Sequence, residues 1–140
     1  MSVKTDNQVR LSNGGSMGYA EYGDSQGRPV LYFHGLPSSR FEINNPDLIE
    51  IAERLHIRVI LADRPGIGLS DFKPYTIASY PDIVAEFADQ LGLDRFPVMG
   101  LSSGGKFVAA CAWKISQRLT TATIVSGTAP FDLPSTRGLK

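Results

Sequence analysis

The alternation of apolar and polar residues near the start of the chain predicts a pair of antiparallel strands. Residues 8–12 and 17–22 alternate in character on either side of Asn13-Gly14-Gly15, a turn sequence, so the two segments are expected to form a hairpin. Further short segments, most of them continuously apolar, predict the strands of a buried sheet. These segments are residues 30–33, 58–62, 97–99 and 121–125.

Apolar residues at helical spacing predict three helices between these strands. The first covers residues 46–55, with Asn45 as its N-cap and Pro46 at the first helical position. The second closes at Gly92, and the third follows the strand at 97–99. The apolar positions of these last two helices are Ile83, Val84, Phe87, Ala88, Leu91, Phe107, Val108, Ala110, Cys111 and Ile115. The remaining segment, residues 126–140, is expected to form an irregular tail.

The order of these elements predicts one α/β domain. A hairpin, three strand-helix units and a final strand imply repeated crossovers. Such crossovers build a mostly parallel sheet with helices on both faces, here with an antiparallel hairpin at its N-terminal end. A length of 140 residues suits a single domain. We found no internal repeat, low-complexity tract or interdomain linker that would divide it.

Composition and charge narrow the class of protein. Hydrophobic residues make up 42% of the chain and charged residues 20%, which is typical of a globular domain. The 14 basic and 14 acidic residues cancel, so neither nucleic acid nor an anionic membrane surface is an expected partner. The single cysteine, Cys111, allows no internal disulfide. No apolar stretch reaches the length of a membrane span or a signal segment, so a cytoplasmic protein is expected.

Residues 97–105, PVMGLSSGG, carry the most informative motif. A short apolar strand runs into G-x-S-x-G and then into a helix. In that context the serine lies on a tight strand-to-helix turn with its hydroxyl exposed as a nucleophile. Ser102 is therefore the candidate nucleophile, and Gly100 and Gly104 are the small neighbours that let strand and helix approach. Chance occurrence in a chain with 14 glycines is the alternative, which the flanking strand and helix disfavour.

The same residues also satisfy a second pattern. Residues 100–106 match G-x-x-x-x-G-K, the start of a phosphate-binding P-loop. The next residue, however, is Phe107, where a Ser or Thr hydroxyl should bind magnesium. The last strand leads into Ser126 rather than into the acidic residue that would assist the metal. The pattern therefore favours a nucleophile over a nucleotide site, and nothing in the sequence calls for a cofactor or a metal.

Three motifs in a fixed order resemble the α/β-hydrolase fold family, of the lipase, esterase and epoxide-hydrolase kind. They are HGLP at 34–37, DRPGIGLS at 63–70 and GLSSGG at 100–105, each directly after a predicted strand. The resemblance covers residues 8–132. It implies a truncated α/β-hydrolase fold with about six of eight strands. The chain would then be a single partial domain, 1–140, whose tail at 128–140 leads toward a missing cap.

The resemblance also assigns roles to site residues. Serine-nucleophile hydrolysis of a small ester-like substrate would use the backbone N–H groups of Leu36 and Ser103 as oxyanion donors, with the helix dipole assisting at Ser103. His34 and Gly35 would shape the oxyanion loop, and His34 would not be the catalytic base. Asp132, just beyond the last strand, is where some family members place the acid, and a solvated tail aspartate is the alternative.

Two other polar residues near the motifs are expected to have no catalytic role. Asp63 is predicted to bond backbone amides in its glycine-rich loop. His56 precedes its strand, so it should lie at the opposite end of the sheet from Ser102, as a surface or helix-end residue.

The order of the catalytic residues raises a difficulty. In the family the acid and the histidine follow the serine, but the two histidines of this chain, His34 and His56, both precede Ser102. Without a base the serine hydroxyl is a weak nucleophile, so the 140-residue chain alone is expected to be a fragment with little activity. The alternative is a non-catalytic α/β-hydrolase-like protein that binds a ligand or partner.

The last strand and Ser102 suggest two further expectations. The apolar edge at 121–125 would normally have a neighbouring strand, so self-association or binding of a partner fragment is predicted. A serine rather than an aspartate at position 102, in the strand-to-helix turn, disfavours epoxide and haloalkane chemistry. It leaves ester, lactone, amide and carbon-carbon cleavage open.

Overall fold

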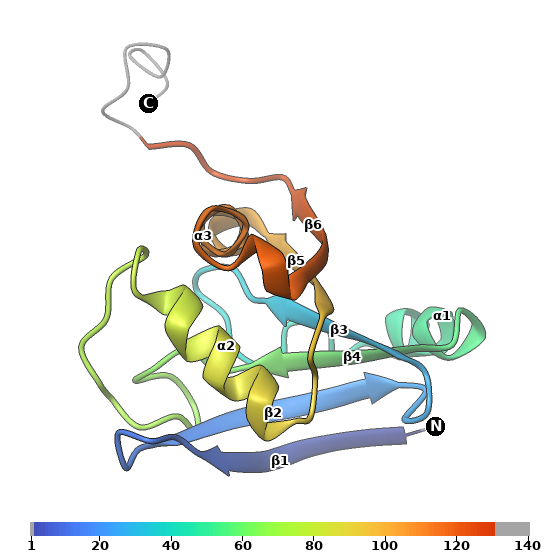
Figure 1. The fold of residues 1–140 in the computed structure, drawn as a ribbon. Helices are drawn as coiled ribbons and strands as arrows, with labels where there is room; N and C mark the ends of the chain where they lie inside the picture. The colour runs from blue at the N-terminus through green and yellow to red at the C-terminus, as the bar shows by residue number, and fades with distance from the viewer. Residues whose placement is uncertain (1, 131–140) are drawn as a thin grey trace.

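The computed structural model describes residues 2–130, which form a six-stranded sheet with the order β1-β2-β4-β3-β5-β6 (Figure 1). The strands are β1 (Ser2–Arg10), β2 (Ser16–Gly23), β3 (Arg28–Phe33), β4 (Ile57–Ala62), β5 (Phe96–Leu101) and β6 (Leu119–Val125). β2 is antiparallel to β1 and to β4, whereas β4, β3, β5 and β6 run parallel. The predicted mostly parallel sheet with an antiparallel N-terminal hairpin is confirmed.

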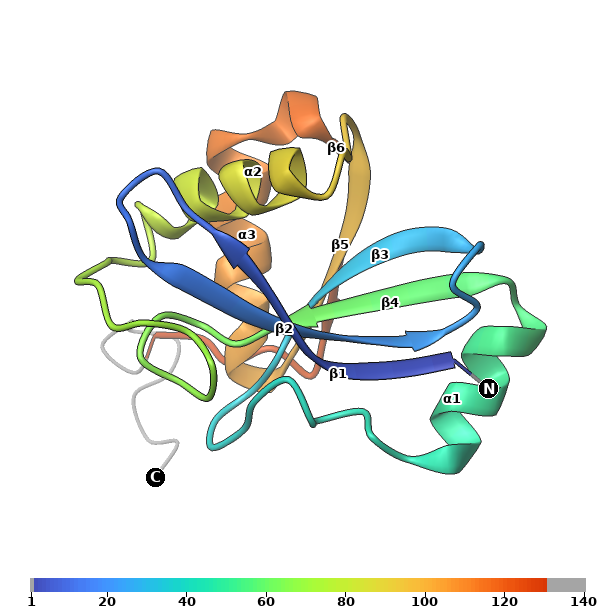
Figure 2. The same cartoon turned by 90° about the horizontal axis from the view of Figure 1, so that it is seen from below.

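Helices cover both faces of this sheet, as predicted. α2 (Tyr80–Gln90) and α3 (Gly105–Lys114) pack on one face, and α1 (Pro46–Arg54) packs on the other (Figures 1 and 2). The Asn45 side chain accepts a hydrogen bond of 2.9 Å from the backbone N–H of Asp47, with Pro46 at the first helical position, so the predicted cap is present. Two short 3-10 turns, Ser102–Gly104 and Ser116–Arg118, flank α3.

The larger of two apolar cores lies between the sheet and the pair α2 and α3. Its aromatic centre is Tyr80 and Phe107, whose ring centroids are 4.7 Å apart. Cys111 is wholly buried in the same core, and burial raises the pKa of its thiol to about 12, so it packs as an apolar residue. Each large apolar side chain buried here contributes roughly 1.5–3 kcal/mol. A smaller core, which includes Tyr22, Tyr32 and Leu61, lies under α1.

Several strand boundaries differ from the predicted ones, most of all those of β1. β1 begins at Ser2, not at residue 8, because residues 2–4 pair with the end of β2 beyond a register shift. Val3 and Lys4 are exposed at this edge, and Val3 is the only apolar residue from 2 to 7, so the segment carries no apolar pattern. β1 ends at Arg10, because the Leu11 N–H and C=O both bond within the following turn. β6 begins at Leu119, two residues before the predicted start.

One edge of the sheet and one side of α1 leave apolar residues exposed. Ile124 and Val125 of β6 are 50% and 41% exposed, and every residue of this strand after Leu119 is exposed. On α1, Ile49 faces the core, while Leu48 and Ile51 are each 47% exposed. Among residues 2–130 no helix has the length and apolar character needed to cross a membrane.

Candidate active site

Three loops meet at one edge of the sheet. β3 lies between β4 and β5 and runs parallel to both, so the three carboxyl ends share this edge. Residues 34–37 follow β3, residues 63–70 follow β4, and Ser102 follows β5 directly. The three sequence motifs are therefore brought together by the strand order.

Ser102 lies on a sharp turn between a strand and a helix. β5 ends at Leu101, and the 3-10 turn that begins at Ser102 continues straight into α3. The backbone φ of Ser102 is +52°, in the left-handed region. That conformation costs a residue with a Cβ on the order of 1–2 kcal/mol. Such strain is often found at functional sites, where the surrounding structure holds it in place.

Close packing explains the two glycines that flank this turn. A Cβ built on Gly104 would lie 2.1 Å from the carbonyl oxygen of Phe33, and one on Gly100 would lie 2.6 Å from the carbonyl oxygen of Gly104. Both contacts are with backbone atoms, which cannot move aside as a flexible side chain could. Strand β5, helix α3 and strand β3 can approach this closely only if both positions lack a side chain.

The turn also excludes the nucleotide-binding alternative. In that alternative residues 100–106 would form a loop around a phosphate. In the structure β5 extends to Leu101 and the helical turn begins at Ser102, so no such loop separates them. The ammonium group of Lys106 lies 5.5 Å from the centre of the Phe107 ring. Among residues 2–130 no group of three His, Cys, Asp or Glu side chains is arranged to hold a metal ion.

His34 is a buried structural residue. It is wholly inaccessible to solvent. Its Nδ1 lies 2.9 Å from the carbonyl oxygen of Gly35, and its Nε2 accepts a hydrogen bond of 3.3 Å from the backbone N–H of Arg64. Burial, and then the positive charge of Arg64, lower the pKa of His34. These partners correspond to a neutral ring protonated on Nδ1. Both ring nitrogens are thus bonded to backbone, and neither is left to accept a proton from Ser102.

Arg64 holds the loop that follows β3. Its side chain is 2% exposed, and burial lowers its pKa. The guanidinium donates to the carbonyl oxygen of His34 through Nη1 and to that of Gly35 through Nη2 at 3.0 Å. A trans peptide is planar, with its N–H opposite its C=O. The Gly35 carbonyl and the Leu36 N–H belong to the same peptide unit. Because the carbonyl points toward Arg64, the Leu36 N–H points away from Arg64.

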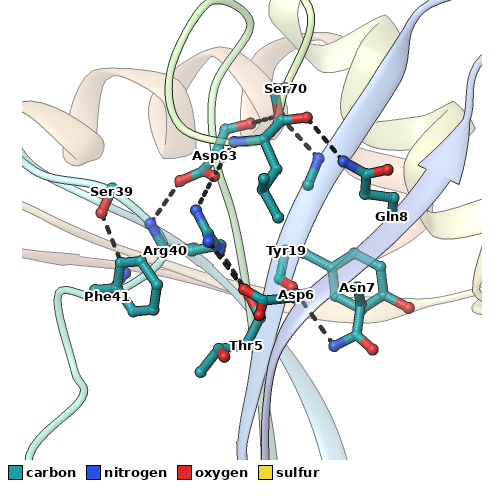
Figure 3. Close-up of polar contacts among 12 residues, drawn as sticks. Thr5, Asp6, Asn7, Gln8, Tyr19, Ser39, Arg40, Phe41, Asp63 and Ser70 are labelled. Atoms are coloured by element: carbon teal, nitrogen blue, oxygen red, sulfur yellow. Dashed lines mark hydrogen bonds and ion pairs between the residues drawn. The ribbon is translucent and has the colours of Figure 1, made fainter.

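Asp63 organises the neighbouring loop (Figure 3). This wholly buried carboxylate accepts hydrogen bonds from the backbone N–H of Arg40 at 2.7 Å, from the Arg40 guanidinium at 2.9 Å and from the backbone N–H of Leu69 at 3.0 Å. The Ser70 hydroxyl donates to the Asp63 carbonyl oxygen at 2.7 Å. The prediction that Asp63 bonds backbone amides in its glycine-rich loop is confirmed.

Of the remaining sequence-predicted residues, only Ser103 belongs to this cluster. His56 is exposed just after α1, 3.0 Å from Asp24, at the opposite end of β4 from Asp63, so its prediction as a helix-end residue is confirmed. Asp132 and most of the tail at 128–140 lie outside the described residues. Ser103 is buried, and among the described residues its hydroxyl has no hydrogen-bond partner.

Three residues that build this edge had no role predicted from the sequence. Arg64 and Arg40 are cations that are 2% and 7% exposed, and Glu42 accepts a hydrogen bond of 2.9 Å from the backbone N–H of Gly35. The only available signal was at Arg64, which is the second charged residue after a buried strand. Arg40 and Glu42 lie in an irregular stretch and gave no pattern.

Comparison with known proteins identifies relatives of the chain. Residues 28–138 match the family model described as alpha/beta hydrolase fold. Haloalkane dehalogenase 2 of Mycobacterium tuberculosis is 34% identical over 112 residues, which are 77% of this chain and 37% of that protein. The non-heme chloroperoxidase of Streptomyces lividans is 32% identical over 131 residues, which are 91% of this chain and 46% of that protein.

A solved structure agrees with this result. A thermophilic esterase from Thermogutta terrifontis superposes with a TM-score of 0.74 at 28% identity, covering 92% of this chain and 48% of the esterase. The chain therefore spans less than half the length of these three relatives.

Proposed function

The chain belongs to the alpha/beta hydrolase fold family, and from that premise we propose that it hydrolyses an ester-like bond through Ser102 as nucleophile. The observation that carries the proposal is the left-handed backbone of Ser102 at a strand-to-helix turn on the carboxyl edge of the sheet. A serine presented in this way has its hydroxyl directed out of the sheet edge, where a substrate carbonyl can approach.

In this proposal the backbone stabilises the charge that develops on the substrate. Ser102 Oγ bonds to the carbonyl carbon and gives up its proton to a base. The resulting oxyanion is held by the N–H groups of Leu36 and Ser103. Arg64 supports the first donor by turning the Leu36 N–H away from itself, and the start of α3 supports the second through its dipole. Loss of one such donor typically lowers the rate about a hundredfold or more.

An ester-like substrate agrees best with a serine at position 102. The relatives named above include a dehalogenase, a chloroperoxidase and an esterase, so their names alone do not decide the reaction. A serine attacking an ester forms an acyl-enzyme that water then releases. The substrate would be a small molecule, and no cofactor takes part in either step.

The base must come from outside the residues described above. His34 is bonded to backbone through both nitrogens, and His56 is at the far end of the sheet. We therefore propose that these 140 residues are a poor enzyme alone and need a histidine and an acid supplied by further polypeptide. A cytoplasmic location is part of the same proposal, and the lone Cys111 agrees with it.

Covalent labelling tests the assignment of Ser102. The whole gene product would be treated with a fluorophosphonate. The buffer would contain imidazole as an external base. Ser102 Oγ should bond to phosphorus as fluoride leaves, and fragment masses should locate the adduct on Ser102 in folded protein only. An adduct that forms equally after unfolding in urea, or that avoids Ser102, would contradict the proposal. Absence of labelling together with stabilisation by a ligand would favour a non-catalytic binding protein.

We also propose that the exposed edge of β6 mediates self-association. Among the described residues no strand pairs with its outer edge, and this edge with the half-exposed Ile124 and Val125 forms a surface of the kind that pairs with another strand. Sedimentation velocity is expected to reveal a species larger than a monomer that grows with concentration. Ile124→Lys should shift the protein toward monomer because a charge disfavours edge pairing. A wild-type chain that stays monomeric across the concentration range would contradict this proposal.

A further inference from the structure

Glu42 lies near Ser102, although no motif or spacing in the sequence predicts a role for it there. It belongs to the turn at residues 40–43 between β3 and α1. Its Oε1 accepts a hydrogen bond of 2.9 Å from the backbone N–H of Gly35. Its Oε2 is buried and meets no hydrogen-bond partner in good geometry among the described residues. Burial, and then the charge of Glu42, raise the pKa of Tyr32, so the Tyr32 hydroxyl also lies near this carboxylate. A buried carboxylate oxygen without a hydrogen bond lowers the stability of the fold, which suggests that this carboxylate is kept for a functional role.

The turn that carries Glu42 is itself held from several sides. The backbone N–H of Arg40 donates to Asp63 at 2.7 Å, and the Arg40 carbonyl accepts from the Tyr22 hydroxyl at 2.8 Å. The backbone N–H of Glu42 donates to the Ser39 carbonyl at 3.0 Å. Because Asp63 and Tyr22 are buried, the Glu42 carboxylate is presented from a fixed support rather than from a mobile loop.

Two side chains hold opposite ends of one peptide unit. The His34 carbonyl and the Gly35 N–H belong to the same planar group. Arg64 donates to the carbonyl, and Glu42 accepts from the N–H. This peptide and the next, whose N–H is that of Leu36, share the Cα of Gly35, so a shift of the Gly35 N–H displaces the atom from which the next peptide extends. The direction of the proposed oxyanion donor is therefore set by Glu42 on one side and Arg64 on the other.

The carboxylate is also close to Ser102. A Cβ built on Gly35 would lie 3.2 Å from Glu42 Oε1, 3.4 Å from the Leu101 carbonyl oxygen and 3.6 Å from Ser102 Cβ. One added carbon would thus contact the carboxylate, the end of β5 and the nucleophile together. Glu42 and Ser102 therefore both lie next to Gly35.

We infer that Glu42 is a positioning residue that aligns the Leu36 N–H for the oxyanion by anchoring the N–H of Gly35. The inference rests on the proposed function of Ser102. Glu42 acts here as a hydrogen-bond acceptor, because a negative charge beside the site would oppose the developing oxyanion rather than stabilise it. A neutral acceptor of the same shape should therefore serve as well as the carboxylate.

Three variants separate the acceptor from the charge. Glu42→Ala removes both, Glu42→Gln keeps the acceptor without the charge, and Glu50→Ala removes an exposed carboxylate on α1 as a control. The rate of phosphonate labelling at Ser102 would be measured well below each thermal transition, in the polypeptide as encoded and with imidazole present. We expect Glu42→Ala to label about tenfold or more slowly. Glu42→Gln and Glu50→Ala should label at or near the wild-type rate.

Amide hydrogen exchange gives a second readout that does not depend on labelling. The Gly35 amide should exchange faster in Glu42→Ala than in wild type and stay protected in Glu42→Gln. Equal labelling and equal protection in Glu42→Ala and wild type would overturn the inference and leave the role of Ser102 intact. A Glu42→Gln variant as slow as Glu42→Ala would also overturn it, because the charge would then matter. A wild-type protein that is not labelled would overturn the proposed function and, with it, this inference.

Discussion

Ser102→Ala is expected to lower the rate of phosphonate labelling at least about a thousandfold, since removing a nucleophile costs several orders of magnitude in related chemistry. The variant should fold as wild type does. Alanine and serine bear the same Cβ, so the left-handed backbone at this position carries a similar strain in both. The free energy of unfolding should change by about 1 kcal/mol or less. Intact-mass kinetics and urea unfolding measure the two quantities on the same samples.

Ser103→Ala is the matched control for that experiment. The Ser103 hydroxyl is buried without a partner among the described residues, so its removal should stabilise the fold by about 1 kcal/mol. Its backbone N–H, which is the group proposed to bind the oxyanion, remains. Labelling should therefore continue at a rate close to wild type. Loss of labelling in Ser103→Ala, or persistence of labelling in Ser102→Ala, would contradict the assignment of the nucleophile.

Sequence patterns predicted the scaffold of the site because they are local. The apolar segments that became β3, β4 and β5 could be read from consecutive residues, and repeated crossovers make such strands parallel. Parallel strands bring their carboxyl ends to one edge, so the approach of His34, Asp63 and Ser102 followed from strand order alone. Gly100 and Gly104 were predicted for the same local reason, and the backbone contacts at 2.6 and 2.1 Å account for them.

The polar network of this edge could not be predicted because its contacts join distant residues. Arg64 bonds carbonyls about 30 positions earlier, and Arg40 bonds a carboxylate 23 positions later. No periodicity marks such pairs, and a charged residue between two strands is most often exposed. The first six residues of β1 were missed for a related reason. Their pairing with β2 satisfies backbone groups at a polar edge and needs no apolar pattern.

Asp63→Ala is expected to destabilise the fold by about 3–5 kcal/mol, the cost of removing one partner from a buried ion pair. The Arg40 guanidinium is almost buried and would lose its 2.9 Å partner. The backbone N–H groups of Arg40 and Leu69 would lose their acceptor as well. Although burial lowers the pKa of Arg40, its bonds to Asp6 and Asp63 raise it above the ordinary value. Without Asp63 the guanidinium still stays charged, because arginine is protonated at any ordinary pH, so deprotonation cannot relieve the loss.

Asp6→Ala provides the comparison, because Asp6 contacts the same guanidinium at 3.1 Å from the solvent side (Figure 3). Its side chain is 76% exposed, so its removal should cost about 1 kcal/mol or less. Urea unfolding of the two variants measures the difference, and equal losses would contradict a buried role for Asp63. The loss of stability in Asp63→Asn should be intermediate between those of the two alanine variants. Asparagine keeps one oxygen acceptor but turns an NH2 group toward groups that are themselves donors. Because Arg40 supports the turn that carries Glu42, the folded fraction of Asp63→Asn should also label more slowly at Ser102.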